Sequence, residues 1–543
     1  MICELYKTQY MKILKLAKWS HRAAIGRGSA ILLIVVGMQT LALPPLQAAT
    51  PKKEITDNGI TTAVEAGFKL EKGVFPNDVD VSTSQGIVTL SGSVANLLAK
   101  ERAVKIAESL RGVRGVIDRI TVTPVSRPDA DIRKDILTAL TQDPATESYQ
   151  VPVSVQDAVV TLTGSVGSYP EKQLAARIAK GVKGVKEVRN DVTINYLEKR
   201  TDPEMAADVK SRLQWDIWIN GGLVNPVVKD GKVTLTGTIG SVISKWRAFD
   251  DAWVIGVTSV DDSGLKIEPT AGNGAQRKFE DAVSSDSDIK LAVQAALRLD
   301  PRVSAFSPDV TVEDGGVILG GTVGNLKAKT AAAQDAKNIM GVWRVDNLLK
   351  VRLNGRTTDA ETEKQLKAAL SWDPLLDSST IDVAVINRTA YLSGAVESSF
   401  EKAEAHDVAS RIKGVLLVRN HLKVEPEFSI SSYDWPYYSY YDWPYYSSYG
   451  WPYYNQSPYY DSEIFGPQPY LSDEQIKKNI ENGFFWSPFV RSDDIKVTVD
   501  GGVATLTGNV GTWIGWGEAD KDAHKSGAAE VLNRVKVKKG RWW

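Results

Sequence analysis

The sequence predicts an α+β protein: a tandem array of six small α-β-β-α-β modules, each a three-stranded sheet covered by two helices. Three observations predict it. A short phrase ending in glycine recurs six times, two alanines recur at fixed distances after each glycine, and an amphipathic helical pattern precedes the phrase. The chain of 543 residues is too long for one core, because single cores stop growing near about 250–300 residues.

The recurring phrase marks a β-hairpin. Thr-Leu-Ser/Thr-Gly occurs four times, and two weaker copies read Ile-Leu-Gly-Gly and Tyr-Leu-Ser-Gly. Apolar and polar residues alternate before the glycine around a polar turn, as in Val153–Leu162, which indicates a hairpin with one buried face. The six phrase glycines are Gly92, Gly164, Gly237, Gly321, Gly394 and Gly508.

A second helix follows each hairpin. Alanine stands eleven and fifteen residues after every phrase glycine, and residues four apart lie on one helical face. We expect these small side chains to let the helix approach the sheet closely. The pairs are Ala103 and Ala107, Ala175 and Ala179, Ala248 and Ala252, Ala332 and Ala336, Ala405 and Ala409, and Ala519 and Ala523.

A later glycine and a last strand complete each copy. A glycine near twenty residues after the phrase suits a helix cap with positive φ, and an Asn or Asp then leads into a strand such as Asp191–Asn195. An amphipathic helix, for example Asp131–Leu140, precedes each hairpin. It ends before proline at Asp143, Asp300 and Asp373, because proline cannot continue a helix.

We number these copies as modules 1 to 6. The expected bounds are 1–49 for a signal peptide, 55–125, 129–197, 203–269, 285–353 and 358–426 for modules 1 to 5, 427–470 for a Tyr/Trp/Pro-rich linker, and 471–540 for module 6.

The order of elements and the motif Gly-Val-Lys-Glu-Val-Arg-Asn at 184–190 resemble the BON domain. Similar proteins include periplasmic osmotic-stress proteins and outer-membrane lipoproteins with two such domains. The resemblance implies a binding module of the cell envelope that engages phospholipid surfaces and has no catalytic residues. Modules 3 and 6 depart from it most, because they gain several tryptophans.

The N-terminal residues have the pattern of an export signal. A basic stretch to Arg27 precedes an apolar run from Ala30 to Leu43, and small residues Ala48 and Ala49 follow two prolines. We predict cleavage there and a periplasmic mature chain, with an uncleaved anchor as the alternative. The only cysteine, Cys3, lies inside this segment, so we expect no disulfide and no thiolate chemistry in the mature chain.

Composition argues against nucleic acid and against catalysis. Residues 1–49 hold six Lys/Arg and one acid, which leaves 59 basic and 65 acidic residues, a net charge of −6, in the remainder. We find no phosphate-binding loop, dinucleotide fingerprint or nucleophile elbow. We therefore predict no enzyme, no cofactor and no metal. His406 and His421 are expected in solvent, carboxylates on exposed faces, and second-helix cations such as Lys105 on a solvated helix face.

Tryptophans are the candidate contacts with lipid or a partner. Trp215 and Trp218 follow an amphipathic helix and either lie at a lipid interface or fill a small core; the sequence favours neither. Trp435, Trp443 and Trp451 recur with a period of eight in the linker, which is either a low-complexity connection or an adhesive strip.

The sequence thus predicts a non-catalytic periplasmic protein that contacts membrane phospholipid or envelope proteins in membrane maintenance or stress protection. Two alternatives stay open. Self-association into a scaffold is the first, since similar α/β modules of secretion systems associate side by side. A chaperone-like role toward unfolded envelope proteins is the second.

Overall fold

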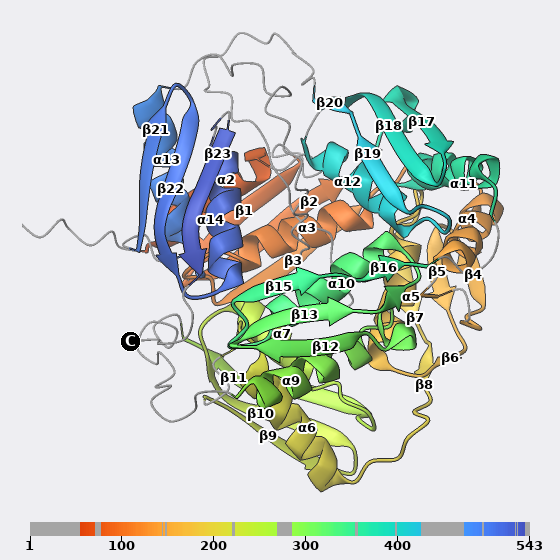
Figure 1. The fold of residues 1–543 in the computed structure, drawn as a ribbon, viewed down its shortest axis with the longest axis horizontal. Coiled ribbons are helices and arrows are strands. Elements are labelled where there is room, and N and C mark those ends of the chain that lie inside the picture. The colour runs from red at the N-terminus through yellow and green to blue at the C-terminus, as the bar shows by residue number, and fades with distance from the viewer. Residues whose placement is uncertain are drawn as a thin grey trace, which may run out of the picture. The chain divides into compact units, whose positions relative to one another are not determined.

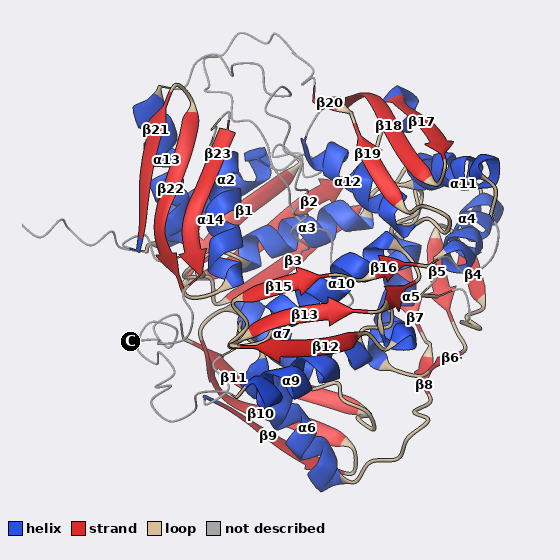
Figure 2. Cartoon of the chain, viewed as in Figure 1, coloured by secondary structure: helices blue, strands red, loops and turns tan. Residues whose placement is uncertain are grey.

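The computed structural model describes residues 55–70, 78–268 except 144, 147, 148 and 220–222, 285–352, 357–424 except 397 and 398, and 472–537 except 491–493, 527 and 529. The predicted fold class is confirmed: six copies of one α-β-β-α-β unit follow one another (Figures 1 and 2). The linker 427–470, with Trp435, Trp443 and Trp451, lies outside the described residues.

The six first helices each span fourteen residues, and most begin with a capping Ser or Thr. They are α2 (Asp57–Leu70), α4 (Asp129–Gln142), α6 (Asp202–Trp215), α9 (Asp286–Leu299), α11 (Asp359–Trp372) and α13 (Asp473–Trp486). The second helices are α3 (Leu97–Glu108), α5 (Tyr169–Lys180), α7 (Val242–Asp251), α10 (Leu326–Lys337), α12 (Ser399–Arg411) and α14 (Trp513–Lys525).

The hairpin strands are β1 (Val79–Ser84) and β2 (Ile87–Val94), β4 (Val153–Gln156) and β5 (Val159–Leu162), β9 (Val224–Lys229) and β10 (Lys232–Ile239), β12 (Asp309–Glu313) and β13 (Gly316–Gly320), β17 (Ile381–Ile386) and β18 (Thr389–Val396), and β21 (Ile495–Asp500) and β22 (Val503–Val510). The last strands are β3 (Gly115–Val122), β7 (Glu187–Asn190), β11 (Ser259–Ile267), β15 (Arg344–Asn347), β19 (Leu417–Asn420) and β23 (Glu530–Val537). Short pairs β6 (Ser165–Val166) with β8 (Thr193–Ile194), and β14 (Thr322–Val323) with β16 (Lys350–Val351), prolong the sheets of modules 2 and 4. Strand β20 (Lys423–Val424) extends that of module 5.

In every module the second hairpin strand is central. In module 1, β2 is antiparallel to β1 and parallel to β3, and the same topology recurs in the other five sheets. A parallel neighbour requires a crossover, which the second helix supplies. Both helices lie on one face of the sheet, so the opposite face carries exposed and half-buried side chains.

The paired alanines pack as predicted. All twelve are fully buried, and each module builds its own core around its pair. A larger side chain would push the second helix away from the sheet, because the interior is close-packed.

Glycine is required at the two recurring positions for different structural reasons. Gly92 has φ of 123°, and a Cβ there would lie 2.0 Å from the carbonyl oxygen of Asp78, which directly precedes β1. Gly112 has the positive φ that the sequence predicts, 93°. The prediction that it caps the second helix was wrong, since α3 ends at Glu108 with Ser109 as its C-cap. Gly112 instead ends the turn into the last strand, where a Cβ would lie 2.5 Å from Ile55.

An Asn or Asp ties the last strand to the second helix. The Asn190 side chain donates to the Lys172 carbonyl at 2.9 Å, and asparagines of modules 4, 5 and 6 make the equivalent bond. In module 1 the residue is Asp118, which cannot donate when ionised. Its carboxylate instead pairs with Lys100 at 3.1 Å.

An aspartate clamp recurs in all six modules and was missed from the sequence. The first residue of each first helix is Asp, and its carboxylate accepts two backbone N–H groups from the hairpin turn. In module 2, Asp129 accepts from Asp157 at 2.9 Å and from Ala158 at 3.0 Å. Both turn residues have positive φ, so their N–H groups point together toward the helix. The others are Asp57, Asp202, Asp286, Asp359 and Asp473.

Substitution of the clamp aspartate Asp129 should destabilise its module strongly, although the residue is only half-buried. Asp129→Ala removes two charge-assisted hydrogen bonds and an acid at a helix N-terminus, so module 2 should lose about 2–3 kcal/mol. Urea unfolding followed by hydrogen exchange of module 2 amides measures the loss. The control is Asp131→Ala, an exposed acid in the same helical turn, which should cost less than about 0.5 kcal/mol. Equal losses from the two variants would show that helix-end charge, not the clamp, matters.

Candidate functional site

One backbone contact joins the modules in three pairs. In modules 3, 5 and 6 the first helix ends in tryptophan: Trp215, Trp372 and Trp486. The carbonyls of these residues accept the N–H of Met340 at 2.9 Å, of Lys183 at 2.8 Å and of Arg111 at 3.0 Å. Each of these donors directly precedes the later glycine of its own module. Module 3 therefore pairs with 4, 5 with 2, and 6 with 1, through what we call the joint.

The indole at each joint packs against the core of the partner module. Trp215 contacts the core of module 4, Trp372 that of module 2, and Trp486 that of module 1. The cores are separate, but each pair shares one aromatic side chain. We therefore expect the stability of each module to depend in part on its partner.

Removing a joint tryptophan should weaken two modules together. Trp372→Ala leaves a void against the module 2 core, and we expect a loss of about 2–3 kcal/mol shared by modules 2 and 5. Hydrogen exchange resolved by module provides the measurement. The matched control is Trp343→Ala, a half-buried tryptophan whose indole N–H bonds the Asp314 carbonyl of its own module. Loss of protection in module 5 alone after Trp372→Ala would contradict the joint.

Acids lie at the C-terminal ends of four first helices: the buried Asp216, Asp300 and Asp373, and the half-buried Asp143. Each carboxylate accepts the N–H two residues further on, at 2.7–2.9 Å, and so shapes the exit from the helix. The negative end of the helix dipole disfavours an anion there. Such carboxylates therefore need nearby cations or a bound proton.

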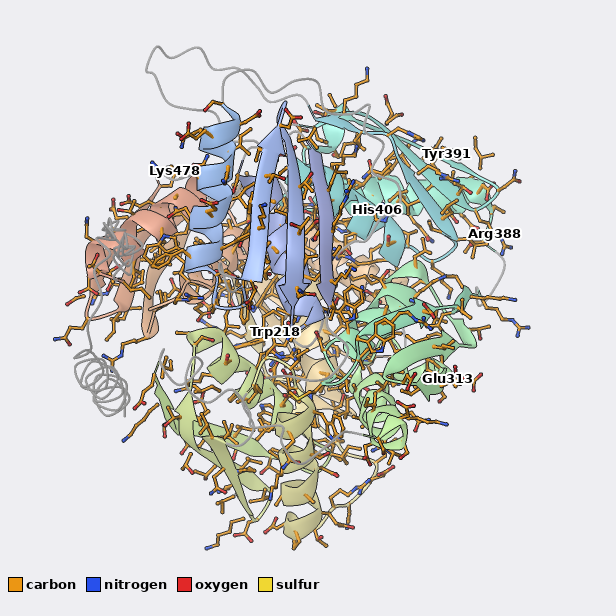
Figure 3. The ribbon with its side chains drawn as sticks, turned by 60° about the vertical axis from the view of Figure 1, so that its left-hand side comes forward. Trp218, Glu313, Arg388, Tyr391, His406 and Lys478 are labelled. Atoms are coloured by element: carbon orange, nitrogen blue, oxygen red, sulfur yellow. The ribbon has the colours of Figure 1, made fainter. Side chains whose placement is uncertain are left out.

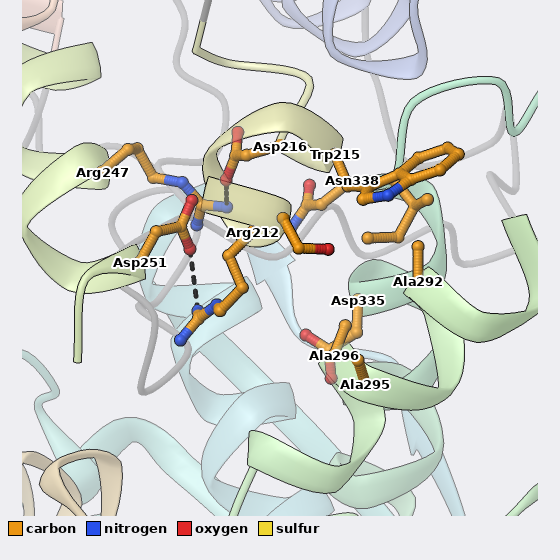
Figure 4. Close-up of a pocket in the computed structure, with 12 residues that line it drawn as sticks. Arg212, Trp215, Asp216, Arg247, Asp251, Ala292, Ala295, Ala296, Asp335 and Asn338 are labelled. Carbon is orange, nitrogen blue, oxygen red and sulfur yellow. Dashed lines mark hydrogen bonds and ion pairs between the residues drawn. The ribbon is translucent and has the colours of Figure 1, made fainter. Parts of the chain in front are cut away.

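Figure 4 shows the pocket between modules 3 and 4 that contains one of these acids. The cavity measures about 60 Å³, and Trp215, Asp335 and Asn338 are among its lining residues. Arg247 pairs with Asp216, and both side chains are at most 5% exposed.

A second ion pair in the same pocket joins Arg212 and Asp251 at 2.8 Å. On the module 4 side, Arg302 pairs with the fully buried Asp300. Of these side chains only Arg212 stays partly exposed, at 16%.

The acids of this cluster outnumber its arginines, and their pKa values respond. Burial, together with the charge of Asp216, raises the pKa of Asp251 to about 7. Burial also raises the pKa of Asp250 to about 6, against the attraction of Arg247. The pKa of Asp335 lies well above its usual value because of burial and of Asp300. Burial in this pocket therefore favours the protonated form of these three acids.

Modules 2 and 5 enclose an equivalent cavity of about 60 Å³, lined by Asp143, Trp372, Asp373 and Arg411 among others. Burial raises the pKa of Asp373 to about 6. Arg411 pairs with Glu404 at 3.1 Å and with Asp407 at 2.8 Å. Two of the three joints thus combine a tryptophan with buried carboxyl groups.

These groups predict a pH dependence of stability. A buried Asp with a raised pKa binds its proton more tightly in the folded state, so its stabilising effect is present at low pH and is lost as pH rises. Unfolding free energy from urea titration should fall between pH 5 and about 7. Asp251→Asn, which cannot ionise, should make that fall shallower.

The control for this measurement is Glu187→Gln, an acid whose side chain is 54% exposed. It should keep the wild-type slope. The comparison ends at pH 7, because burial lowers the pKa of Lys105 to about 7 and adds an opposite slope above it. An unchanged slope in Asp251→Asn would refute the titration of this joint.

The structure places Trp215 and Trp218 between modules. Trp218, labelled in Figure 3, is 9% exposed. Its ring meets that of Phe489 of module 6 edge-on, with ring centroids 4.3 Å apart. Its indole N–H also points at Asn338 of module 4, at 3.5 Å. Of the two alternatives left open by the sequence, packing describes these two residues, although against neighbouring modules and not within one small core.

Three expectations about charged side chains were wrong. Carboxylates such as Asp300 are buried, not on exposed faces. His406 is half-buried on α12, and burial lowers its pKa, whereas His421 is exposed as predicted. Lys105 lies over the ring of Trp246 from module 3 at 4.4 Å, so the second helix faces other modules and not solvent. Sequence patterns within one module do not report such contacts.

Within the described ranges, no group of three or more His, Cys, Asp or Glu side chains is arranged to hold a metal ion. Over the same residues, no helix is both long and apolar enough to cross a bilayer.

The recurring fold defines a class of small α/β domains, and the comparison with known families identifies it. The BON domain matches residues 56–124, 128–196, 201–269, 285–352, 358–426 and 472–539, which is most of the chain. The chain therefore belongs to the BON-domain family.

A curated relative, osmotically-inducible protein Y of Escherichia coli (strain K12), is 35% identical over 143 residues. That alignment covers 25% of this chain and 71% of the relative. Family and relative together point to a non-enzymatic protein.

Two solved structures of CdsD, a structural protein of the type III secretion system of Chlamydia trachomatis, are 15% and 14% identical to this chain. They cover 39% and 40% of it, and 100% and 97% of their own length. The TM-score is 0.11 in both cases, so this similarity carries no argument.

Proposed function

We propose that this chain is an exported periplasmic protein that binds the membrane surface without catalysing a reaction. The carrying observation is the outward sheet face of each module. Two helices cover one side of every sheet, and the strands leave their other side exposed or half-buried. A repeated sheet face of this kind suits a broad surface better than a small ligand, which needs a concave site.

The family and its relative support this proposal. The name of the relative, osmotically-inducible protein Y, concerns osmotic stress, a condition in which the pressure across the cell envelope changes. Phospholipid is the partner that we propose for this chain, and maintenance of the envelope under stress is the role.

Vesicle sedimentation tests the proposal. The purified full chain should pellet with vesicles of equimolar phosphatidylglycerol and phosphatidylcholine, and less with phosphatidylcholine alone, because Lys and Arg near the surface add about 1 kcal/mol each on anionic lipid. A chain without residues 428–470 shows whether the aromatic linker takes part. No sedimentation with either vesicle would sink the proposal.

Export rests on the N-terminal pattern, in which a basic stretch and an apolar run precede Ala48 and Ala49. Protein recovered from the periplasm should begin near residue 49 or 50 on terminal sequencing. An intact Met1 there would contradict cleavage.

A self-assembling scaffold is the second candidate, and the joint favours it. Modules of one chain contact each other through the same joint three times. A module of one chain could form this joint with a module of a second chain. Light scattering of the pure protein over a range of concentrations separates this candidate from lipid binding.

A further inference from the structure

Among the described residues, exposed large apolar side chains gather most densely on the outer sheet face of module 5. Ile386 is 56% exposed, Tyr391 38% and Leu417 41%. Strand register makes them neighbours: Thr389 lies between Ile386 and Leu417, and Tyr391 occupies the next outward row. Outward side chains two residues apart on one strand lie on the same face, so the three form a continuous patch.

The other described sheet faces are poorer in such side chains. Module 1 has two exposed large apolar residues on its outer face and module 3 has one. These are Ile87, Ile117 and Val227. The face of module 5 is therefore distinct within a set of otherwise equivalent surfaces.

Three cations lie in the same sheet as the apolar patch. Arg388 lies in the hairpin turn, Arg419 pairs in register with Tyr391, and Lys423 lies on β20. Figure 3 shows Arg388 and Tyr391 on the side of the sheet away from the helices. Asp382 is the one carboxylate on strands β17 to β20, so this face is basic although the chain as a whole is slightly acidic.

The outer faces of modules 5 and 2 differ at one neighbouring position. Arg189 occupies the position of Arg419 there, and it pairs with Glu187 at 3.0 Å. The position of Glu187 is taken by Leu417 in module 5. Leu417 thus places an apolar side chain where module 2 has the carboxylate of Glu187.

We propose that the outer sheet face of module 5, around Ile386, Tyr391 and Leu417, is the surface that docks on anionic phospholipid headgroups. This rests on the proposed function and names the face that performs it.

Each component of the patch suits the headgroup region. A tyrosine ring prefers the membrane interface, because its body is apolar and its hydroxyl stays hydrated. Ile386 and Leu417 supply apolar area for shallow insertion, and the flanking cations attract phosphate. No buried group must be exposed for this contact, unlike a contact through Trp218.

A fluorescent label placed on the patch tests the assignment. Cys3 is the only cysteine, so Cys3→Ser with Tyr391→Cys carries one polarity-sensitive label in the full chain. The matched control is Thr161→Cys, at the equivalent position of module 2. On equimolar phosphatidylglycerol and phosphatidylcholine vesicles, the label at 391 should shift to the blue and the label at 161 should not.

A charge substitution supplies a second readout. Arg419→Ser should weaken partitioning to these vesicles about fivefold, because one cation near an anionic surface is worth roughly that factor. Arg189→Ser, the matched change in module 2, should leave partitioning unchanged. Circular dichroism of both variants checks that neither result comes from unfolding.

The possible outcomes are distinguishable. A wild-type chain that sediments, with a silent label at 391 and no effect of Arg419→Ser, keeps the proposed function and overturns this face. A wild-type chain that binds no vesicle overturns both. The label at 391 could also report an apolar environment without vesicles and a polar one when residues 428–470 are deleted. That result would mean that this segment covers the face, and it too would overturn the proposal.

Discussion

The close approach of the second helix to the sheet is the contact on which every module depends. Alanine at two positions four apart is what allows it, and all twelve of these side chains are fully buried. The consequence is a thin core in a module of about seventy residues. The side of the second helix that faces away from the sheet would be exposed to solvent in an isolated module. The need to cover it explains why modules associate, and why the second helices carry buried charges such as Arg102 and Lys327.

The joints meet this need at an electrostatic cost. An acid at the negative end of a helix, withdrawn from water, is unfavourable unless it is paired or protonated. Arg247 and Arg302 supply pairs in modules 3 and 4. Burial raises the pKa of Asp373 to about 6 and raises that of Asp143 above its usual value, so the charge at these helix ends depends on pH.

The sequence predicts the interior of one module well and the contacts between modules poorly. Hairpin, helices, last strand and paired alanines follow from periodicity and fixed spacing, because each depends on residues within one copy. The aspartate clamp could have been predicted from the sequence, because an aspartate stands 35 residues before each phrase glycine, for example Asp129 before Gly164. It was missed because an acid at a helix start already has a local explanation. The position of Trp218 was not predictable, because its neighbours come from modules 4 and 6.

The pairing of modules is nested: 3 with 4, 2 with 5, and 1 with 6. During synthesis the chain emerges from its N-terminus, so modules 1 and 2 are complete well before the tryptophans that cover them, Trp486 and Trp372, have been made. Their exposed helix ends must wait for the second half of the chain. Lengthening the segment between modules 5 and 6 enlarges only the outermost loop, and loop-closure entropy grows slowly with length, about 0.6 kcal/mol for each doubling. In the nested order the connections between modules 1 and 2 and between modules 5 and 6 both belong to this outermost loop, so an insertion such as 427–470 disturbs pairing little at that position.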